Sequence, residues 1–225
     1  MESNNGANEP RDANDKEVYR CRLKLVLLGE SSVGKTSIVT RFTTGKFQRN
    51  NATIGAAFLN KNIRWVDEDN IYEVDLEIWD TAGQERYRSL APIYYRNTDV
   101  ALIVFDVTSS NTFQKARSWV DELRSYLDNE QGKEIQLYLI GNKCDLEHES
   151  IAKTAILDMC TFKEVSAKRD EGIQELFEEI ARGIPTDKFI LQSPSNQLDV
   201  TDNNCTVMLK KSFDDLSKNV GCNYC

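Results

Sequence analysis

The sequence predicts an α/β fold in which helices cover both faces of a mostly parallel sheet. Near-continuous apolar runs at residues 23–28, 100–107 and 135–140 are typical of strands that are buried on both sides. Segments with a helical spacing of apolar residues lie between strands, and this alternation favours a parallel sheet. A chain of 225 residues with 40% hydrophobic content can bury one sizeable core, so we expect one domain with tails.

The first elements follow a polar N-terminal tail. Residues 1–19 are rich in Asn, Asp and Glu and have almost no apolar content, so we expect them to be disordered. The domain is expected over residues 20–184, where the strand at 23–28 leads through a glycine-rich turn into a helix. Residues 73–79 alternate between polar and apolar side chains, as expected of a strand with one exposed face.

Two helices and a further strand are indicated in the second half of the chain. The helices are indicated by apolar residues at intervals of three and four: Phe113, Ala116, Val120, Leu123 and Leu127 in one, and Ile173, Leu176, Phe177, Ile180 and Ile184 in the other. A strand is expected at residues 161–165. Residues 185–225 gather Pro, Ser, Asn and Asp, and they are expected to form a flexible tail.

The turn after the first strand has the sequence GESSVGKTS, residues 29–37. Glycine permits backbone turns in which successive N–H groups point at one anion. The pattern G-x-x-x-x-G-K-[ST] places a lysine at the β- and γ-phosphates of a nucleotide and a hydroxyl on Mg²⁺. The alternative is a plain strand-to-helix turn with a surface lysine. The expected nucleotide-binding residues of this turn are Ser32, Val33, Gly34, Lys35, Thr36 and Ser37.

A second polar cluster, WDTAGQE at residues 79–85, follows the alternating strand. Asp80 at the end of the strand is the Walker-B type of Mg²⁺ partner, and Gly83 allows the backbone to approach a ligand closely. Gln84 is uncharged and can orient a water molecule by both donating and accepting hydrogen bonds. Taken alone, the string DTAG also fits a simple turn.

Two further strings follow later strands. In GNKCD, residues 141–145, the carboxylate of Asp145 can accept two hydrogen bonds from an N–H/NH₂ edge, which guanine presents and adenine does not. Asn142 can hold the base and its own loop, and the aliphatic stem of Lys143 can cover the ring. The backbone N–H of Ala167 can meet a base carbonyl. Ligands of parallel sheets bind at the carboxyl ends of the strands, so all these clusters are expected to meet there.

Together, GESSVGKT, TIG at residues 53–55, DTAGQE, NKCD and SAK at residues 166–168 resemble the five guanine-nucleotide boxes of Ras-like small GTPases. The resemblance spans residues 22–184. Within that superfamily, TIGAAF, LEIW, RYRSL and YYRN look like Rab signatures, and AAF after TIG with SLAPxYYR is similar to the early-endosomal branch. The expected fold is an α/β P-loop three-layer sandwich. It has a mostly parallel six-stranded sheet, one antiparallel edge strand and helices on both faces.

The resemblance implies roles for individual residues. Lys35 would bind the β- and γ-phosphates, and Thr36 and Thr53 would ligate Mg²⁺. Asp80 would hold the Mg²⁺ through water, and Gln84 would be the catalytic residue that positions the attacking water. GTP and GDP are the implied substrate and product.

The resemblance also implies a base-binding set and an effector surface. Phe47 matches the aromatic residue that packs beside the base, and further nucleotide contacts are implied for Gly83, Asn142, Lys143, Asp145, Ser166, Ala167 and Lys168. The aromatic triad through which active Rabs meet effectors is matched by Phe58, Trp79 and Tyr94.

The sequence departs from the family pattern in three places. Residues 47–53 are one residue shorter than is usual between the aromatic residue and the switch threonine. The stretch between Asn142 and Ser166 is several residues short, so the helix usually found there is expected to be trimmed. Extra residues are expected in a hairpin around residues 66–70. The first departure bears on nucleotide exchange and effector choice.

The chain ends in GCNYC at residues 221–225. Cys222 fits the C-a-a-X geometry of a prenylation site, and Cys225 suits a second lipid. The alternatives are an unmodified tail and a zinc site, although a second cysteine pair at ligand spacing is missing. From Pro185 onward, five acidic residues stand against four lysines, so stable membrane attachment is expected to need two prenyl groups.

Composition argues against several other classes. The net charge of −8 argues against a broad nucleic-acid surface. The polar, acidic first twenty residues do not match a signal sequence, and no apolar run reaches eighteen residues. We therefore expect a protein of the cytosol with its six cysteines free of disulfides. The resemblance further implies the cytoplasmic face of endosomal membranes, with a lipid anchor.

The leading hypothesis is a monomeric GTP-hydrolysing switch that regulates vesicular traffic, in which the γ-phosphate orders two loops. Its implied partners are a nucleotide exchange factor, a GTPase-activating protein, effectors, a dissociation inhibitor and a prenylation escort. One alternative is a nucleotide-bound scaffold that hydrolyses weakly or not at all. A further alternative, a P-loop ATPase or small-molecule kinase, is disfavoured by NKCD and SAK.

Overall fold

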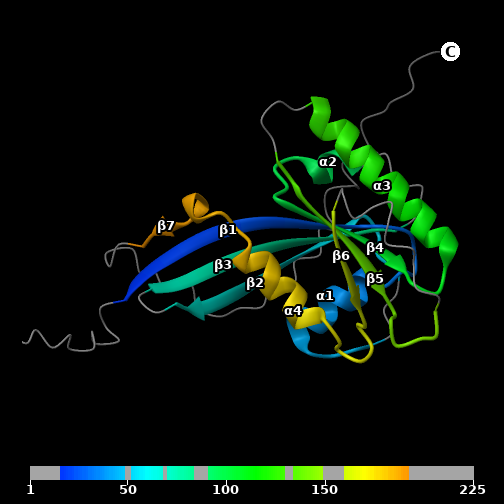
Figure 1. Ribbon diagram of the computed structural model, residues 1–225, viewed down its shortest axis with the longest axis horizontal. Coiled ribbons are helices and arrows are strands. Elements are labelled where there is room, and N and C mark those ends of the chain that lie inside the picture. The colour runs from blue at the N-terminus through cyan, green and yellow to red at the C-terminus, as the bar shows by residue number, and fades with distance from the viewer. Residues whose placement is uncertain are drawn as a thin grey trace, which may run out of the picture.

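The computed structural model describes residues 16–48, 52–67, 70–83, 91–129, 134–148 and 160–192 (Figure 1). In chain order its elements are β1 (Glu17–Leu28), α1 (Lys35–Thr44), β2 (Ala56–Val66), β3 (Asn70–Thr81), α2 (Ala91–Tyr95), β4 (Val100–Asp106), α3 (Ser110–Asn129), β5 (Gln136–Asn142), β6 (Thr161–Val165), α4 (Ile173–Arg182), a 3₁₀ helix (Thr186–Lys188) and β7 (Ile190–Leu191). None of the helices in the described part of the chain is long and apolar enough to span a membrane.

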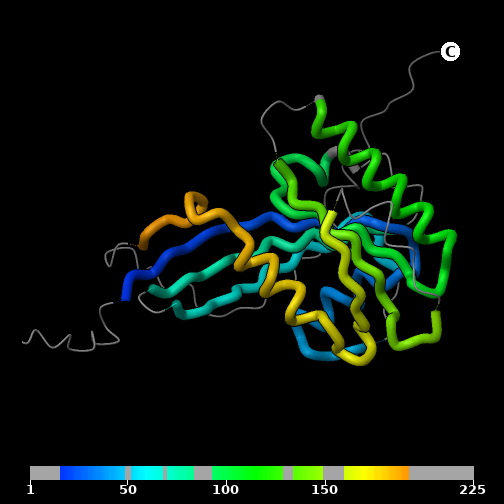
Figure 2. Tube along the Cα trace, in the orientation of Figure 1, coloured from blue at the N-terminus to red at the C-terminus, as the bar shows by residue number. Residues whose placement is uncertain are grey.

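The strands form one mixed sheet in the order β2-β3-β1-β4-β5-β6. All neighbours along this path pair in parallel except β2 and β3, which pair antiparallel. The predicted α/β fold, with a mostly parallel sheet and one antiparallel edge strand, is confirmed. The short strand β7 adds a second antiparallel pairing, to the first half of β1 (Figure 2).

The predicted strands and helices lie where their apolar patterns indicated. The continuous run at residues 100–106 forms β4, which is buried on both faces, whereas β3 has alternating buried and half-buried residues over Val74–Asp80. The two helical patterns form α3 and α4. Burial therefore follows the periodicity that each segment showed in the sequence.

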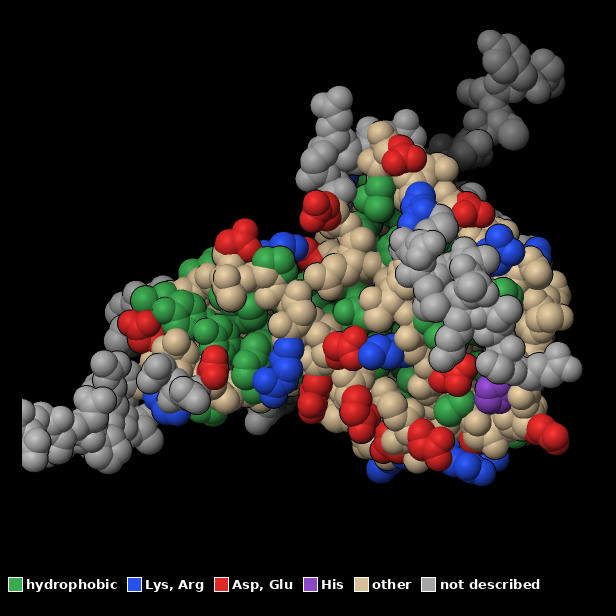
Figure 3. Space-filling model, viewed as in Figure 1, with side chains coloured by type: hydrophobic (Ala, Val, Ile, Leu, Met, Phe, Trp, Pro, Cys, Tyr) green, Lys and Arg blue, Asp and Glu red, His purple; other side chains and the backbone are tan. Residues whose placement is uncertain are grey.

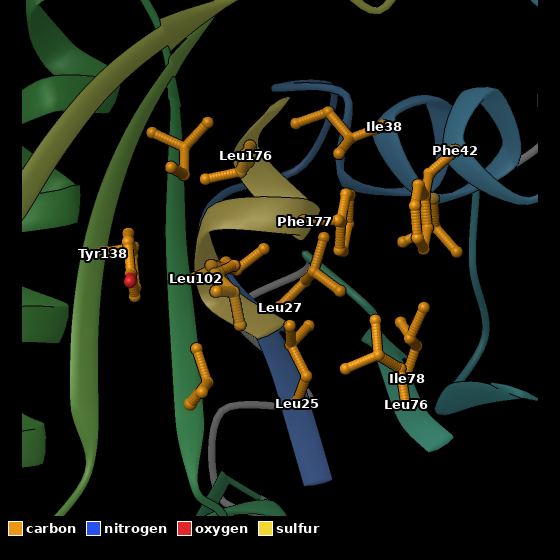
Figure 4. Close-up of a cluster of buried hydrophobic side chains, with 14 of the residues drawn as sticks. Leu25, Leu27, Ile38, Phe42, Leu76, Ile78, Leu102, Tyr138, Leu176 and Phe177 are labelled. Carbon is orange, nitrogen blue, oxygen red and sulfur yellow. The ribbon is translucent and has the colours of Figure 1, made fainter. Parts of the chain in front are cut away.

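Helices cover the sheet on both faces and create two apolar cores. On one face, α1 and α4 pack against side chains of β1, β3 and β4, as Figure 4 shows for Leu25, Leu27, Leu76, Ile78 and Leu102. Phe42 of α1 and Phe177 of α4 stack there with ring centroids 3.8 Å apart. On the other face, α3 packs over a second cluster. Packing of these two cores fixes the positions of the carboxyl ends of β1, β3, β5 and β6, where the candidate site residues lie.

Strands β1, β2 and β3 extend past the helical layers and form a projecting part of the sheet (Figure 1). Pairing of β1 with β3 begins at Glu17 and Asn70, whereas β4 joins β1 only from Leu25. The expected hairpin joins Val66 to Asn70. We call residues 17–22, 61–66 and 70–75 the distal sheet.

A segment after α4 closes the free edge of the distal sheet. The 3₁₀ helix and β7 bring this segment back along β1, and Gln192 N–H donates to the Val18 carbonyl at 2.8 Å. Asp99 links the 3₁₀ helix of this segment to β1, because its carboxylate accepts hydrogen bonds from the Lys24 N–H at 2.9 Å and from Lys188 Nζ at 2.8 Å. The described elements run from Glu17 to Leu191, so β1 begins within the expected N-terminal tail of residues 1–19. The 3₁₀ helix and β7 lie within the expected tail of residues 185–225.

Candidate functional site

The turn between β1 and α1 has a backbone that requires glycine at two positions. Gly29 and Gly34 have φ values of +137° and +99°. A Cβ at Gly29 would collide with the carbonyl oxygen of Val104, and one at Gly34 would collide with the side-chain amide of Asn142. The turn therefore packs tightly against residues of β4 and β5, and α1 begins directly after it at Lys35. Its N–H groups lie at the positive end of a helix, which suits an anion.

Lys35 is buried inside this turn, with 5% of its surface exposed. Its Nζ donates to the carbonyl oxygens of Gly29 at 2.7 Å and Glu30 at 2.9 Å. Burial lowers the pKa of the ammonium to about 8, against the partial compensation of Asp80 and Glu30. An anionic ligand would reverse this effect, because it favours the charged form.

Three oxygen-bearing side chains converge beside the turn. Thr36 Oγ1 donates to Asp80 Oδ2 at 2.6 Å and lies 2.9 Å from Thr53 Oγ1. Asp80 is 1% exposed, and its Oδ1 is buried without a hydrogen-bond partner. Burial raises the pKa of the carboxyl, which the two threonine hydroxyls and Lys35 only partly oppose. Hydroxyl and carboxylate oxygens with an unused buried lone pair fit a hard divalent cation such as Mg²⁺.

The segment after β3 lies against the same turn. The Thr81 hydroxyl donates to the Leu27 carbonyl at 2.5 Å, which ties the end of β3 to the end of β1. A Cβ at Gly83 would collide with the Glu30 carbonyl oxygen, so only glycine permits this approach. The predicted catalytic residue, Gln84, lies outside the described residues.

Asn142 connects the phosphate-type turn with the two loops expected to bind a base. Its Nδ2 donates to the Val33 carbonyl at 2.8 Å, and its Oδ1 accepts from the Ala167 N–H at 3.2 Å. The residue is only 2% exposed. The structure thus brings residues 29–37, 142–145 and 166–168 together at one sheet edge, as the order of the strands predicted.

Asp145 and Lys143 lie on the loop after β5. The Ser166 hydroxyl donates to Asp145 Oδ1 at 2.7 Å and lowers the pKa of this carboxyl, with Lys168 Nζ 3.6 Å from Oδ2. The carboxylate therefore stays ionised, as an acceptor for an N–H/NH₂ edge must. Lys143 has a φ of +71° and donates from Nζ to Asp106 Oδ2 at 2.6 Å, which fixes its stem across the loop.

Sequence reasoning missed Arg41, which joins α1 to the loop after β6. Its guanidinium donates to the carbonyls of Ala167 and Lys168, both at 2.9 Å, and of Gly45 at 2.7 Å. Phe47, which is 47% exposed, lies with its ring 6.0 Å from the same guanidinium. No local pattern could have indicated this role, because two of the three acceptors are backbone atoms more than 120 residues away.

The three predicted surface aromatics are neighbours on the other face of the sheet. Phe58 of β2 pairs with Trp79 of β3, and their rings meet edge to face with centroids 5.3 Å apart. Tyr94 lies 6.3 Å from the Trp79 ring, and Lys24 Nζ lies 5.0 Å from the same ring. The two C-terminal cysteines, Cys222 and Cys225, lie outside the described residues.

The fold and the β1–α1 turn define a P-loop nucleotide-binding protein of the α/β class. The chain belongs to the Ras family, whose model its sequence matches over residues 24–186. This match and the relatives below confirm the resemblance to Ras-like small GTPases and to their Rab branch.

Three yeast proteins illustrate the relationship. The chain is 42% identical to GTP-binding protein YPT52 of Saccharomyces cerevisiae over 190 residues, which cover 71% of this chain and 80% of that protein. It is 39% identical to GTP-binding protein YPT53 of the same yeast over 215 residues, which cover 89% and 94%. It is 43% identical to GTP-binding protein ypt5 of Schizosaccharomyces pombe over 186 residues, which cover 79% and 85%.

Proposed function

We propose that the chain is a GTP-binding and GTP-hydrolysing switch that regulates endosomal vesicle traffic through GTP-dependent effector binding. Family membership supports this function, since Ras and Rab proteins hydrolyse GTP to GDP. The observation that carries it is the convergence of a buried P-loop lysine, a buried unpartnered carboxylate oxygen and the Asn142–Asp145 loop at one sheet edge.

The phosphates would lie in the β1–α1 turn. Lys35 would exchange its two carbonyl acceptors for phosphate oxygens, and the N–H groups of residues 32–37 would donate to the same anion. Thr36, Thr53 and Asp80 would hold Mg²⁺, which would neutralise charge that develops on the phosphates. Thr53 would then connect the γ-phosphate and Mg²⁺ to its own loop, so that the loop would be ordered with GTP and released with GDP. Gln84 would orient the attacking water.

The base would lie between the loops after β5 and β6. Asp145 would accept two hydrogen bonds from guanine, and Lys143 would cover the ring. The Ala167 N–H, which donates to Asn142 Oδ1, would be shared with the base carbonyl. Phe47 would pack beside the base, with Ser166 and Lys168 holding Asp145. This arrangement disfavours an ATPase or kinase, because adenine would leave the Asp145 carboxylate without donors. A non-hydrolysing scaffold is disfavoured by the complete set of phosphate-binding and metal-binding residues.

Family membership also implies regulators. An exchange factor, a GTPase-activating protein and effectors are the partners of such switches. We further propose a dissociation inhibitor, a prenylation escort and two lipid groups at Cys222 and Cys225. The protein would act as a monomer, without nucleic acid, and would cycle between cytosol and endosomal membrane. Effectors would meet Phe58, Trp79 and Tyr94.

The base assignment is tested by competition for bound fluorescent GDP. We expect GTP to compete and ATP to fail by orders of magnitude, because a site built on such pairs rejects partners that leave it unpaired. Asp145→Asn should shift the preference toward xanthosine triphosphate, since xanthine has a carbonyl where guanine has an amine. Asp187→Asn, an exposed change in the 3₁₀ helix, is the matched control and should retain GTP preference. Equal competition by ATP and GTP in the native chain would refute the assignment.

A further inference from the structure

An aromatic surface lies on the distal sheet, far along β1 from the nucleotide site. Tyr19, Trp65 and Tyr72 stack across three strands, with centroids 5.5 Å apart for Tyr19 and Tyr72 and 5.3 Å apart for Trp65 and Tyr72. Phe189 meets the rings of Trp65 and Tyr72 edge to face at 6.1 and 5.3 Å. All four side chains remain half-buried. We call these four residues the distal aromatic surface.

This surface continues onto β7. Tyr19 is the register partner of both Tyr72 and Leu191, so one row of apolar side chains crosses β2, β3, β1 and β7. Leu191, on the same face as Tyr19, is 46% exposed. Figure 3 shows hydrophobic side chains gathered over this part of the molecule. A contiguous exposed apolar patch is a mark of an interaction surface, whereas scattered apolar residues are not.

The chain itself offers a segment that fits this surface. Leu209, Phe213, Leu216 and Val220 recur at intervals of four, three and four residues, which would place them on one face of a helix. Gly221 follows at the position where glycine ends helices. A helix of this length is marginal alone in water, so it needs a surface that buries its apolar face. The N-terminal residues 1–15 are too polar to fill this role.

The position where the chain leaves β7 and a charged residue beside the surface also favour binding of this C-terminal segment. The chain leaves β7 at Gln192 beside the surface, and the 16 residues before Leu209 span about 20 Å as a flexible linker. Because the segment is tethered to the domain, its effective concentration at the distal aromatic surface is on the order of millimolar. At the border of the surface, the Arg182 guanidinium lies 5.3 Å from the Trp65 ring, where it can pair with Asp214 or Asp215.

We propose that residues 206–220 fold back as a helix and dock on the distal aromatic surface of the same chain. Docking leaves 5 free residues after Val220 in place of 33 after Gln192, and the reach of the C-terminus falls from about 30 Å to about 12 Å. Undocking would therefore let the domain stand farther from a membrane. This consequence rests on the proposed lipid attachment, but docking itself does not.

Limited trypsin cleavage of the full chain at Lys210 and Lys211, followed by mass spectrometry, tests docking without any lipid. Cleavage tracks the undocked population, so Phe213→Gln in the segment and Leu191→Glu on the surface should each accelerate it about tenfold. Lys218→Gln, on the polar side of the segment, and Val66→Glu, on the opposite face of the distal sheet, are matched controls in which Lys210 and Lys211 should be cleaved as in the native chain.

Three results would overturn the proposal. Unchanged cleavage in Phe213→Gln would show that the segment is not docked, and unchanged cleavage in Leu191→Glu would show that it docks elsewhere. Protection that grows with protein concentration would assign the contact to a second copy of the chain. Protection that arises only with vesicles of anionic lipid would assign the segment to the membrane.

Discussion

Replacement of Arg41 by alanine tests whether α1 supports the base-binding loop. The native guanidinium makes one half-buried hydrogen bond to the Ala167 carbonyl and two more exposed ones, and its side chain is 13% exposed. Hydrogen bonds from charged donors contribute about 1.5 to 3 kcal/mol when sheltered and less when exposed. We therefore expect Arg41→Ala to lower the free energy of unfolding by roughly 2 to 3 kcal/mol.

The same change should accelerate release of GDP. If about 2 kcal/mol of the loss falls on the loop at residues 166–168, release of a fluorescent GDP analogue should become roughly 30-fold faster. Arg41→Lys should recover only part of the effect, because lysine lacks the planar fork that reaches three carbonyls. Arg22→Ala is the control, since that side chain is 76% exposed, forms one ion pair with Glu77 and should cost at most about 0.5 kcal/mol. Release from Arg41→Ala at the Arg22→Ala rate would refute the supporting role.

Two further predictions concern charge. The lowered Lys35 pKa of about 8 means that nucleotide binding above this pH must take up a proton, so affinity should fall by up to tenfold per pH unit between pH 8 and the ordinary lysine value of 10.5. The free energy of unfolding of the nucleotide-free chain should rise over the same pH range, since the unfolded chain binds more protons there. Titration calorimetry of nucleotide binding at pH 9 measures the proton uptake directly, and binding without proton uptake would contradict the lowered pKa of Lys35. A doubly prenylated protein should pellet with membranes at both low and high salt, while Cys222→Ser or Cys225→Ser alone should leave weak, reversible attachment. A C-terminal peptide of unmodified mass in the membrane fraction would show that the anchor lies elsewhere.

Features that depend on local sequence could be predicted without a structure. Gly29 and Gly141 each follow an apolar run directly, Asp80 follows the alternating strand, and parallel strands bring such positions to one edge. The geometry of glycine turns also has a strong local signature, because few other residues adopt a positive φ. These properties explain why the sheet, its helices and the positions of the expected phosphate, metal and base residues could be assigned from the sequence.

Features that depend on distant backbone atoms could not be predicted. Arg41 contacts carbonyl groups, which carry no side-chain signal. The two-residue strand β7 exists because the first half of β1 lacks a neighbour on one edge and Asp99 holds Lys188, yet its residues fall in a segment whose composition indicated a flexible tail. The partnership of Lys143 with Asp106 likewise joins two separate strand ends.

Single-turnover release of phosphate from bound GTP tests the central claim, that this protein is a hydrolysing switch, most directly. The native chain with Mg²⁺ should release phosphate slowly, at roughly 10⁻⁴ to 10⁻² s⁻¹, because its proposed site includes no cationic finger. Gln84→Leu should remain bound to GTP, even with a GTPase-activating protein that accelerates the native chain. GTP that stays intact on the native chain with that activator present would contradict the claim and favour a nucleotide-bound scaffold.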